Sequence, residues 1–168
     1  QRGHNAHFVV LGEQIYDTAG DQGYSEQLKK LCRELGIENR VSFLGFRRDS
    51  APLLRSMDAL VHASIKPEPF GRVIIEAMAS GTPVTASAAG GPLEILQHGA
   101  TGLLHQPGDI LGMADNVEKL LRPEFAEPIR RAALTSYQEK FTHERYNYNL
   151  HEKVKLASCL ASPPATGA

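Results

Sequence analysis

The chain has 168 residues, and its 18 lysines and arginines against 19 aspartates and glutamates leave a net charge of −1. This balance argues against a nucleic-acid-binding protein and against a polybasic membrane module, because both carry a basic excess. No apolar run approaches the roughly 20 residues that cross a bilayer. Cys32 and Cys159 match no metal or disulfide spacing, so we expect a globular protein in the reducing cytoplasm.

Short apolar segments alternate with amphipathic segments, as in a Rossmann-like parallel α/β sheet with helices on both faces. Ser25 is placed to cap the helix after the first strand, and Cys32 lies on the apolar stripe of that helix. Asp109 is placed to cap a later helix, whose apolar face runs from Ile110 to Leu121. The expected strands are residues 7–11, 41–44, 59–63, 83–86 and 102–105. The expected helices are residues 25–35, a short one starting at Asp49 or Ser50, 71–80, 93–97, 110–121, 128–140 and 144–156, before a disordered tail at 157–168.

Residues 66–91, KPEPFGRVIIEAMASGTPVTASAAGG, carry the residues best suited to chemistry. Ligands of such sheets bind where the strands end, and Glu68 lies in the loop after the third strand, with a proline on either side. Gly71 lets the backbone come close to a ligand where the next helix begins. The free backbone N–H groups of residues 70–73, Arg72 included, and the helix dipole suit a phosphate group. The pattern therefore predicts an anion-binding helix start beside Glu68.

Glu76 lies inside that helix, about a turn and a half beyond Gly71. The helix is apolar on most of its faces, which predicts burial on most faces, and a buried carboxylate needs a partner. Ribose hydroxyls are good partners for a carboxylate, which only accepts hydrogen bonds. The alternative is a surface Glu76 paired with Arg72 at i, i+4, worth about 0.3–0.5 kcal/mol. Glu68 is likewise compatible with a solvated loop residue, and the pattern alone leaves both alternatives open.

The run EPFGRVIIEAMASGTPV resembles the donor-binding signature of the group 1 glycosyltransferases, a retaining family with the GT-B fold. That signature has two glutamates separated by seven residues, with F-G after the first and E-A-M-A-x-G-x-P-V at the second. Further segments follow the family's order over about residues 7–156, among them FVVLG, NRVSFLGF, MDALVHAS and GGPLEILQHGATGLL. This ordered set is far more specific than a lone pair of glutamates. The resemblance implies that residues 1–156 form a nucleotide-sugar binding domain, the C-terminal half of a GT-B enzyme.

The resemblance also implies roles for individual residues. Glu76 matches the glutamate that hydrogen-bonds the ribose of the nucleotide sugar. Glu68, the implied catalytic residue, matches the glutamate near the hydroxyls of the donor sugar. The backbone of Phe70 and Gly71 would lie against the sugar and the diphosphate. The other implied donor-site positions are Gly12 facing the nucleotide, Phe46 and Arg47 at the base, and Gly90, Gly91 and Glu94 in a turn near the donor. Arg47 is also compatible with a solvated loop pair with Arg48.

The nucleotide diphosphate of such a donor is a charged leaving group, so the enzyme must stabilise negative charge on its phosphates. In the GT-B fold, the resemblance implies, helix N-termini and basic side chains do this without a metal or another cofactor. The sequence agrees, since its seven histidines are scattered and no acidic D-x-D triplet occurs. We therefore expect no metal site.

The resemblance begins at what would be the second strand of the donor domain. The family's preceding strand–helix unit, which holds an arginine and a lysine for the diphosphate, is not visible. Because that strand is central in the usual order 3-2-1-4-5-6, we expect a gap in the sheet with unpaired backbone groups. We expect the chain alone to be inactive without an N-terminal acceptor domain, through which it could also lie at a membrane surface. A strand donated by another copy could fill the gap.

Two kinds of function fit these observations. One is a sugar-transferring enzyme, and the other is a non-catalytic nucleotide-binding or scaffold domain with the same fold. A GT-B epimerase or phosphorylase shares the architecture, but the glutamate pair favours transfer. A dinucleotide-dependent oxidoreductase is disfavoured, because Gly12-Glu13-Gln14 stands where G-x-G-x-x-G would follow the first strand.

Overall fold

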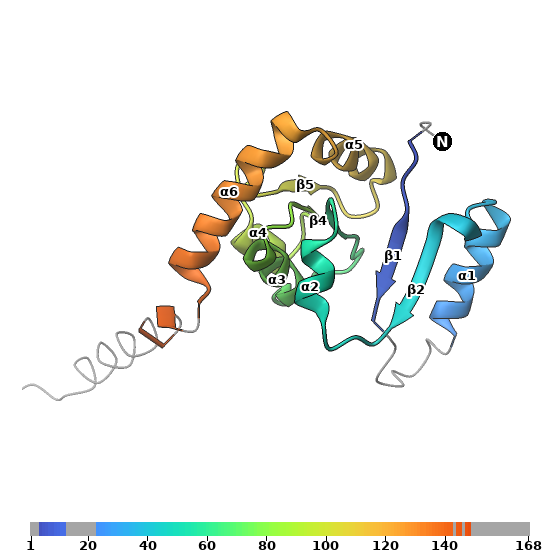
Figure 1. The fold of residues 1–168 in the computed structure, drawn as a ribbon, viewed down its shortest axis with the longest axis horizontal. Helices are drawn as coiled ribbons and strands as arrows, with labels where there is room; N and C mark the ends of the chain where they lie inside the picture. The colour runs from blue at the N-terminus through green and yellow to red at the C-terminus, as the bar shows by residue number, and fades with distance from the viewer. Residues whose placement is uncertain (1–3, 13–22, 143, 146, 149–168) are drawn as a thin grey trace, which may run out of the picture. The chain divides into compact units, whose positions relative to one another are not determined.

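The computed structural model of the protein describes residues 4–12, 23–142, 144–145 and 147–148 (Figure 1). They form two compact units, a first unit up to Ser50 and a second unit from Ala51 onward. The predicted tail at residues 157–168 and most of the predicted helix at 144–156 lie outside the described residues. Among the helices that are described, none combines the length and the apolar character that crossing a bilayer requires.

The first unit is a two-stranded parallel sheet with one helix. Phe8 lies opposite Val41 where the pairing begins. Lys29 of the helix lies 5.9 Å from the ring centroid of Phe43, so the helix packs beside the second strand (Figure 1). The elements of this unit are β1 (Phe8–Leu11), α1 (Tyr24–Glu34), the 3-10 helix η1 (Glu38–Arg40) and β2 (Val41–Gly45).

Two predictions for α1 are wrong. Ser25 does not cap the helix, because the helix begins one residue earlier and follows Gly23, whose backbone is left-handed with a φ of 97°. The predicted core stripe is not covered either, since no residue of α1 is buried, Leu31 is 48% exposed and Cys32 is half-buried. A two-stranded sheet offers too little apolar surface to bury such a stripe.

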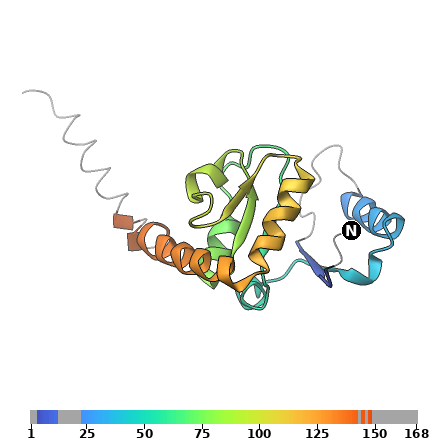
Figure 2. The ribbon, with the colours of Figure 1, turned by 90° about the horizontal axis from the view of Figure 1, so that it is seen from above.

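The second unit contains a three-stranded parallel sheet in the order β3–β4–β5, with Leu60 opposite Val84 and Thr85 opposite Leu103. Helix α3 packs against β3 and β4, α5 packs against β4 and β5, and α6 contacts both helices. Figure 2 shows the green helix α3 and the gold helix α5 on opposite sides of the strands. The elements are α2 (Ser50–Arg55), which starts at the boundary, β3 (Leu60–His62), α3 (Arg72–Ser80), β4 (Val84–Ser87), α4 (Gly91–Ile95), β5 (Leu103–His105), α5 (Ile110–Leu120) and α6 (Pro123–Lys140).

Strand β4 explains why both faces of this sheet are covered. All four of its residues are buried, and alternate side chains of a strand face opposite layers. Val84 and Ala86 join the apolar core that also holds Met78 of α3. Thr85 faces the other layer, where its hydroxyl accepts a hydrogen bond from the side chain of Asn116 of α5 at 3.2 Å. The predicted α/β class with helices on both faces is confirmed.

Two helices begin earlier than the sequence predicts. Helix α4 begins at Gly91 rather than residue 93, and α6 begins at Pro123 rather than residue 128. Both helices carry a proline in the first turn, where its missing N–H has no acceptor to lose. Pro128, which suggested the start of α6, lies inside that helix.

Helix α5 has its predicted cap but only part of its predicted apolar face packs inward. The carboxylate of Asp109 accepts a backbone N–H of the first turn at 2.9 Å. The predicted apolar face is wrong at its ends, because Ile110 is 72% exposed and Leu121 is 40% exposed, while Met113, Ala114 and Val117 between them are half-buried. Asn116 and Leu120 are buried instead. The side chain of Asn116 bonds to the sheet, and these polar contacts turn that side of the helix inward.

The unpaired strand edges that the sequence predicts are present among the described residues. Strand β1 pairs with β2 alone and β3 pairs with β4 alone, so each has one edge without a strand partner. In the order 3-2-1-4-5-6, these two strands correspond to the neighbours of the first, central strand. The strand pairing within each unit is therefore the pairing expected when the chain is matched to this order from the second strand onward.

Candidate functional site

The loop that carries Glu68 is paired through its backbone with the loop after β4. The amide of Gly91 donates to the carbonyl oxygen of Glu68 at 2.7 Å, and the amide of Glu68 donates to the carbonyl oxygen of Ala89 at 3.4 Å. Glu68 and Gly90 form an isolated parallel bridge. The side chain of Glu68 is 35% exposed. The backbone at Glu68 is therefore fixed, while its carboxylate can still be reached by a ligand.

Gly90 and Gly91 make this pairing sterically possible. A Cβ on Gly90 would overlap the carbonyl oxygen of Glu68. A Cβ on Gly91 would overlap the carbonyl oxygen of Phe70 and would lie 2.7 Å from its Cα. The structure thus gives the glycine pair a positioning role for the Glu68 loop. Glu94, from the same predicted turn, lies exposed in the first turn of α4.

Helix α3 begins directly after the Glu68 loop. Gly71 is its N-cap residue with a φ of 91°, a backbone conformation that suits glycine. No side chain caps this helix start, and the first backbone N–H groups of a helix have no acceptor within it. Phe70, just before the cap, is 53% exposed. Donors and a positive dipole end are therefore available beside Glu68.

Glu76 lies 42% exposed on α3, with its Oε1 3.7 Å from Nη2 of Arg72. The surface pair that the sequence left open is thus present in the structure. The prediction that α3 is buried on most of its faces is wrong in part, because Ile74 and Met78 are fully buried but Val73 is 39% exposed. A ligand can reach the carboxylate of Glu76, since Arg72 is 84% exposed and exposed pairs contribute less than about 1 kcal/mol.

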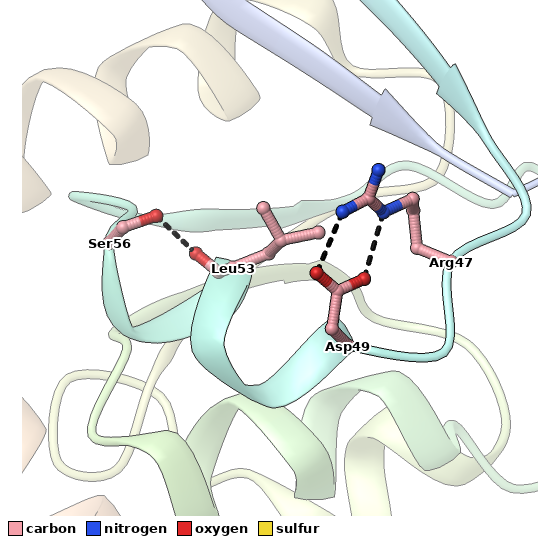
Figure 3. A network of polar contacts seen from close by, with 4 residues as sticks. All are labelled: Arg47, Asp49, Leu53 and Ser56. Carbon is pink, nitrogen blue, oxygen red and sulfur yellow. Dashed lines mark hydrogen bonds and ion pairs between the residues drawn. The ribbon is translucent and has the colours of Figure 1, made fainter.

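The remaining predicted residues lie in the first unit, at the carboxyl ends of β1 and β2. The amide of Gly12 donates to the carbonyl oxygen of Gly45 at 2.9 Å, and Phe46 is 56% exposed. Arg47 donates to both carboxylate oxygens of Asp49, at 2.8 and 2.7 Å (Figure 3). These hydrogen bonds lower the pKa of Asp49 and raise the pKa of Arg47. The Arg47 guanidinium could contact a base either by breaking its hydrogen bonds to Asp49 or by stacking a flat face of the guanidinium on the base.

A buried histidine ends β5 in a polar network. His105 is 7% exposed, and its Nδ1 and Nε2 lie 3.2 and 3.4 Å from the hydroxyl oxygens of Thr85 and Ser87. Burial lowers the pKa of His105, a nearby Asp109 carboxylate opposes this shift, and His62 adds to it. The ring is therefore held mainly neutral near pH 7.

We expect the free energy of unfolding to fall on mild acidification because of His105. The unfolded chain takes up the proton near the ordinary pKa of 6.5, before the folded chain does. The contribution of this group is therefore complete above that pH and declines below it. Urea unfolding between about pH 7.5 and pH 5.5 measures the effect. His105→Gln should flatten this dependence, and an unchanged slope in the variant would refute the assignment.

His62, the last residue of β3, has no role that the sequence predicts. His62 is 8% exposed, and its Nε2 lies 3.9 Å from Oε2 of Glu68. The available signal was a polar ring at the end of an apolar strand, in VHAS, just before the glutamate motif. Such a residue is commonly core filling, which is why the sequence does not single it out.

The cavity beside β5 is lined by none of the predicted donor residues. In the part of the chain that the structure describes, no group of three or more His, Cys, Asp or Glu side chains is placed to hold a metal ion. The cavity measures about 470 Å³ and is lined by Ala88, His98, Leu104, His105, Gln106, Asp109, Gly112, Asp115, Asn116 and Lys119.

The ordered motifs and the two-loop arrangement agree with one known family. The model of the glycosyl transferases group 1 matches residues 1–156. The chain belongs to this family. It is 37% identical over 157 residues to an uncharacterized glycosyltransferase of Methanocaldococcus jannaschii, which covers 92% of this chain. It is 40% identical over 117 residues to the N-acetyl-alpha-D-glucosaminyl L-malate synthase of Bacillus anthracis, which covers 69% of this chain.

Solved structures agree with this family assignment. The crystal structure of Anabaena HepE in complex with UDP aligns with 89% of this chain at a TM-score of 0.83 and 34% identity. The complex of HepE with UDP-glucose gives a TM-score of 0.81 and 35% identity over 88% of this chain. The chain spans 38% and 30% of the two relatives above and 41% of the HepE chain with UDP. It thus corresponds to less than half of the length of each of these proteins.

Proposed function

We propose that this chain binds the nucleotide-diphosphate sugar used in a sugar-transfer reaction, with residues 1–156 as the donor-binding domain. The backbone hydrogen bond from Gly91 to Glu68 carries this proposal. It holds the loop that bears an acidic side chain beside the uncapped start of α3. The complexes of HepE with UDP and with UDP-glucose support the same ligand class for this chain. A uridine nucleotide is accordingly the first ligand to test.

Within this proposal, each predicted residue has a defined task. Glu76 accepts hydrogen bonds from the ribose hydroxyls, and Glu68 interacts with the hydroxyls of the donor sugar. The N–H groups at Phe70, Gly71 and Arg72 bind the diphosphate. Gly12 faces the nucleotide, and Phe46 and Arg47 contact the base. Gly90 and Gly91 support the donor loop, and Glu94 lies near the donor.

The chemistry is the breaking of the bond between the anomeric carbon and the phosphate oxygen. The leaving nucleoside diphosphate keeps the electron pair, while an acceptor hydroxyl forms the new bond and loses its proton. Backbone donors aimed at the phosphates stabilise the growing negative charge more in the transition state than in the ground state. We propose that no metal takes part and that the configuration at the anomeric carbon is retained, as the family resemblance implies.

We propose that transfer also requires an N-terminal acceptor domain outside this chain. The support is that the chain spans 30–38% of the relatives compared above. We therefore expect negligible transfer by this chain alone and a cytoplasmic location, with membrane contact through the acceptor domain. The unpaired edges of β1 and β3 could take a strand from that polypeptide or from a second copy.

Calorimetric titration of the chain with UDP, GDP and ADP tests the proposal. We expect saturable binding of at least one nucleotide and little transfer of sugar in a parallel assay. Absence of binding to all three nucleotides and their sugar derivatives would refute the proposed function. Substantial transfer by the chain alone would refute the need for a second domain.

A non-catalytic nucleotide-binding domain is the second candidate. Nucleotide binding without transfer in every protein that contains this chain would favour this candidate. Transfer that is lost on Glu68→Gln would exclude it.

A further inference from the structure

His62 is a buried side chain that lies near the carboxylate of Glu68. Its Nε2 lies 3.9 Å from Oε2 of Glu68 and 3.4 Å from the hydroxyl oxygen of Ser64. Its Nδ1 is buried and has no hydrogen-bond partner among the described residues. A buried polar atom without a partner is destabilising, and a phenylalanine would fill the same space without that cost. A histidine at this position is therefore useful through its Nε2 side.

The surroundings determine which nitrogen of His62 carries the proton. An ionised carboxylate only accepts hydrogen bonds, whereas a hydroxyl both donates and accepts. A hydrogen bond from His62 to Glu68 therefore requires the proton on Nε2, which in the neutral ring is the Nε2–H tautomer. The backbone of Glu68 is locked by Gly91 and Ala89, so only side-chain rotation separates the present 3.9 Å from a hydrogen bond. Such bonds are often long before a substrate is bound.

We propose that His62 is a positioning residue for Glu68. Its Nε2–H donates to the Glu68 carboxylate and holds it towards the hydroxyls of the donor sugar. This inference rests on the proposed function of Glu68 and adds a residue that acts through it. Its effect should fall on the sugar part of the donor and leave the nucleotide part unaffected.

Substitutions at His62 separate hydrogen bonding from packing. The side-chain amide nitrogen of His62→Gln approximates Nε2, that of His62→Asn approximates Nδ1, and His62→Phe fills the space without a donor. His105→Gln is the matched control, because His105 is equally buried at 7% against 8% and bonds to other partners. The measured quantity is the affinity for UDP-glucose divided by the affinity for UDP, determined by calorimetry on the full chain.

We expect His62→Phe and His62→Asn to lower this ratio roughly tenfold, as for the loss of one hydrogen bond to a charged group. His62→Gln should restore it to within about twofold, and the control should leave it unchanged. Equal loss of UDP and UDP-glucose binding, or rescue by Asn as good as by Gln, would overturn the inference. In Glu68→Gln, the substitutions at His62 should have no further effect on the ratio.

A second measurement decides the inference without a ligand. A long-range ¹H–¹⁵N spectrum of the chain at neutral pH should show His62 with Nε2 protonated and Nδ1 unprotonated. The Nε2 resonance should move in Glu68→Gln. The Nδ1–H tautomer, or a Nε2 resonance that ignores this substitution, would overturn the inference. If neither UDP nor UDP-glucose binds, the choice of a uridine nucleotide fails separately, while the spectrum still reports on the contact between His62 and Glu68.

Discussion

Gly91→Ala is expected to lower the free energy of unfolding by about 3 kcal/mol, at the upper end of overpacking effects. The added methyl group would overlap the carbonyl oxygen of Phe70, which is backbone and cannot rotate away as a side chain would. The two loops would have to separate, and the 2.7 Å hydrogen bond from the Gly91 amide to the Glu68 carbonyl oxygen would be lost. Urea unfolding of the purified chain measures this change.

Gly99→Ala is the matched control for Gly91→Ala. Gly99 has a φ of 79°, and a Cβ built there meets no atom within 4 Å. This variant should therefore cost only the left-handed strain of about 1 kcal/mol. A loss of stability in Gly91→Ala no larger than in Gly99→Ala would show that the two loops are not held together as described.

Glu76→Ala is expected to weaken UDP binding by roughly 10–100-fold. Hydrogen bonds to a charged group contribute about 1.5–3 kcal/mol, and each 1.4 kcal/mol is a factor of about ten. The fold should survive, because the Glu76 side chain is 42% exposed and its ion-pair partner, Arg72, is 84% exposed. Calorimetric titration of the variant with UDP, together with its thermal unfolding, separates lost binding from lost folding.

Glu139→Ala is the control for the change in charge, since Glu139 is an exposed residue of α6 outside the predicted site. It should bind UDP as the unchanged chain does. If both Glu76→Ala and Glu139→Ala bound UDP within about twofold of the unchanged chain, Glu76 would be only one half of a surface ion pair with Arg72. The ribose contact would then be wrong.

The sequence predicted the parts of the fold that local chemistry determines. Gly71 and Gly81 bound α3 because each adopts a left-handed backbone at a helix end, and Asp109 caps α5 through its own carboxylate. The edge positions of β1 and β3 were also predictable, because the motifs keep a fixed order along the chain. Each of these features depends on residues that are close in sequence or on an ordered motif.

Features that depend on distant partners could not be predicted from the sequence. The α1 stripe was expected to be buried, but its exposure depends on how much sheet is there to cover it. The role of Gly91 depends on the backbone of Phe70, which lies in another loop. His62 gained its importance only when the fold placed its ring near Glu68.

Titration of ¹⁵N-labelled chain with UDP-glucose, followed by amide chemical shifts, shows whether the donor binds beside Glu68 and Glu76. We expect the largest changes in chemical shift on residues 68–76 and on Gly90 and Gly91, and we expect these changes to saturate together. Saturable changes confined to the cavity beside β5 and α5, with the amides around Glu68 and Glu76 unmoved, would contradict this prediction.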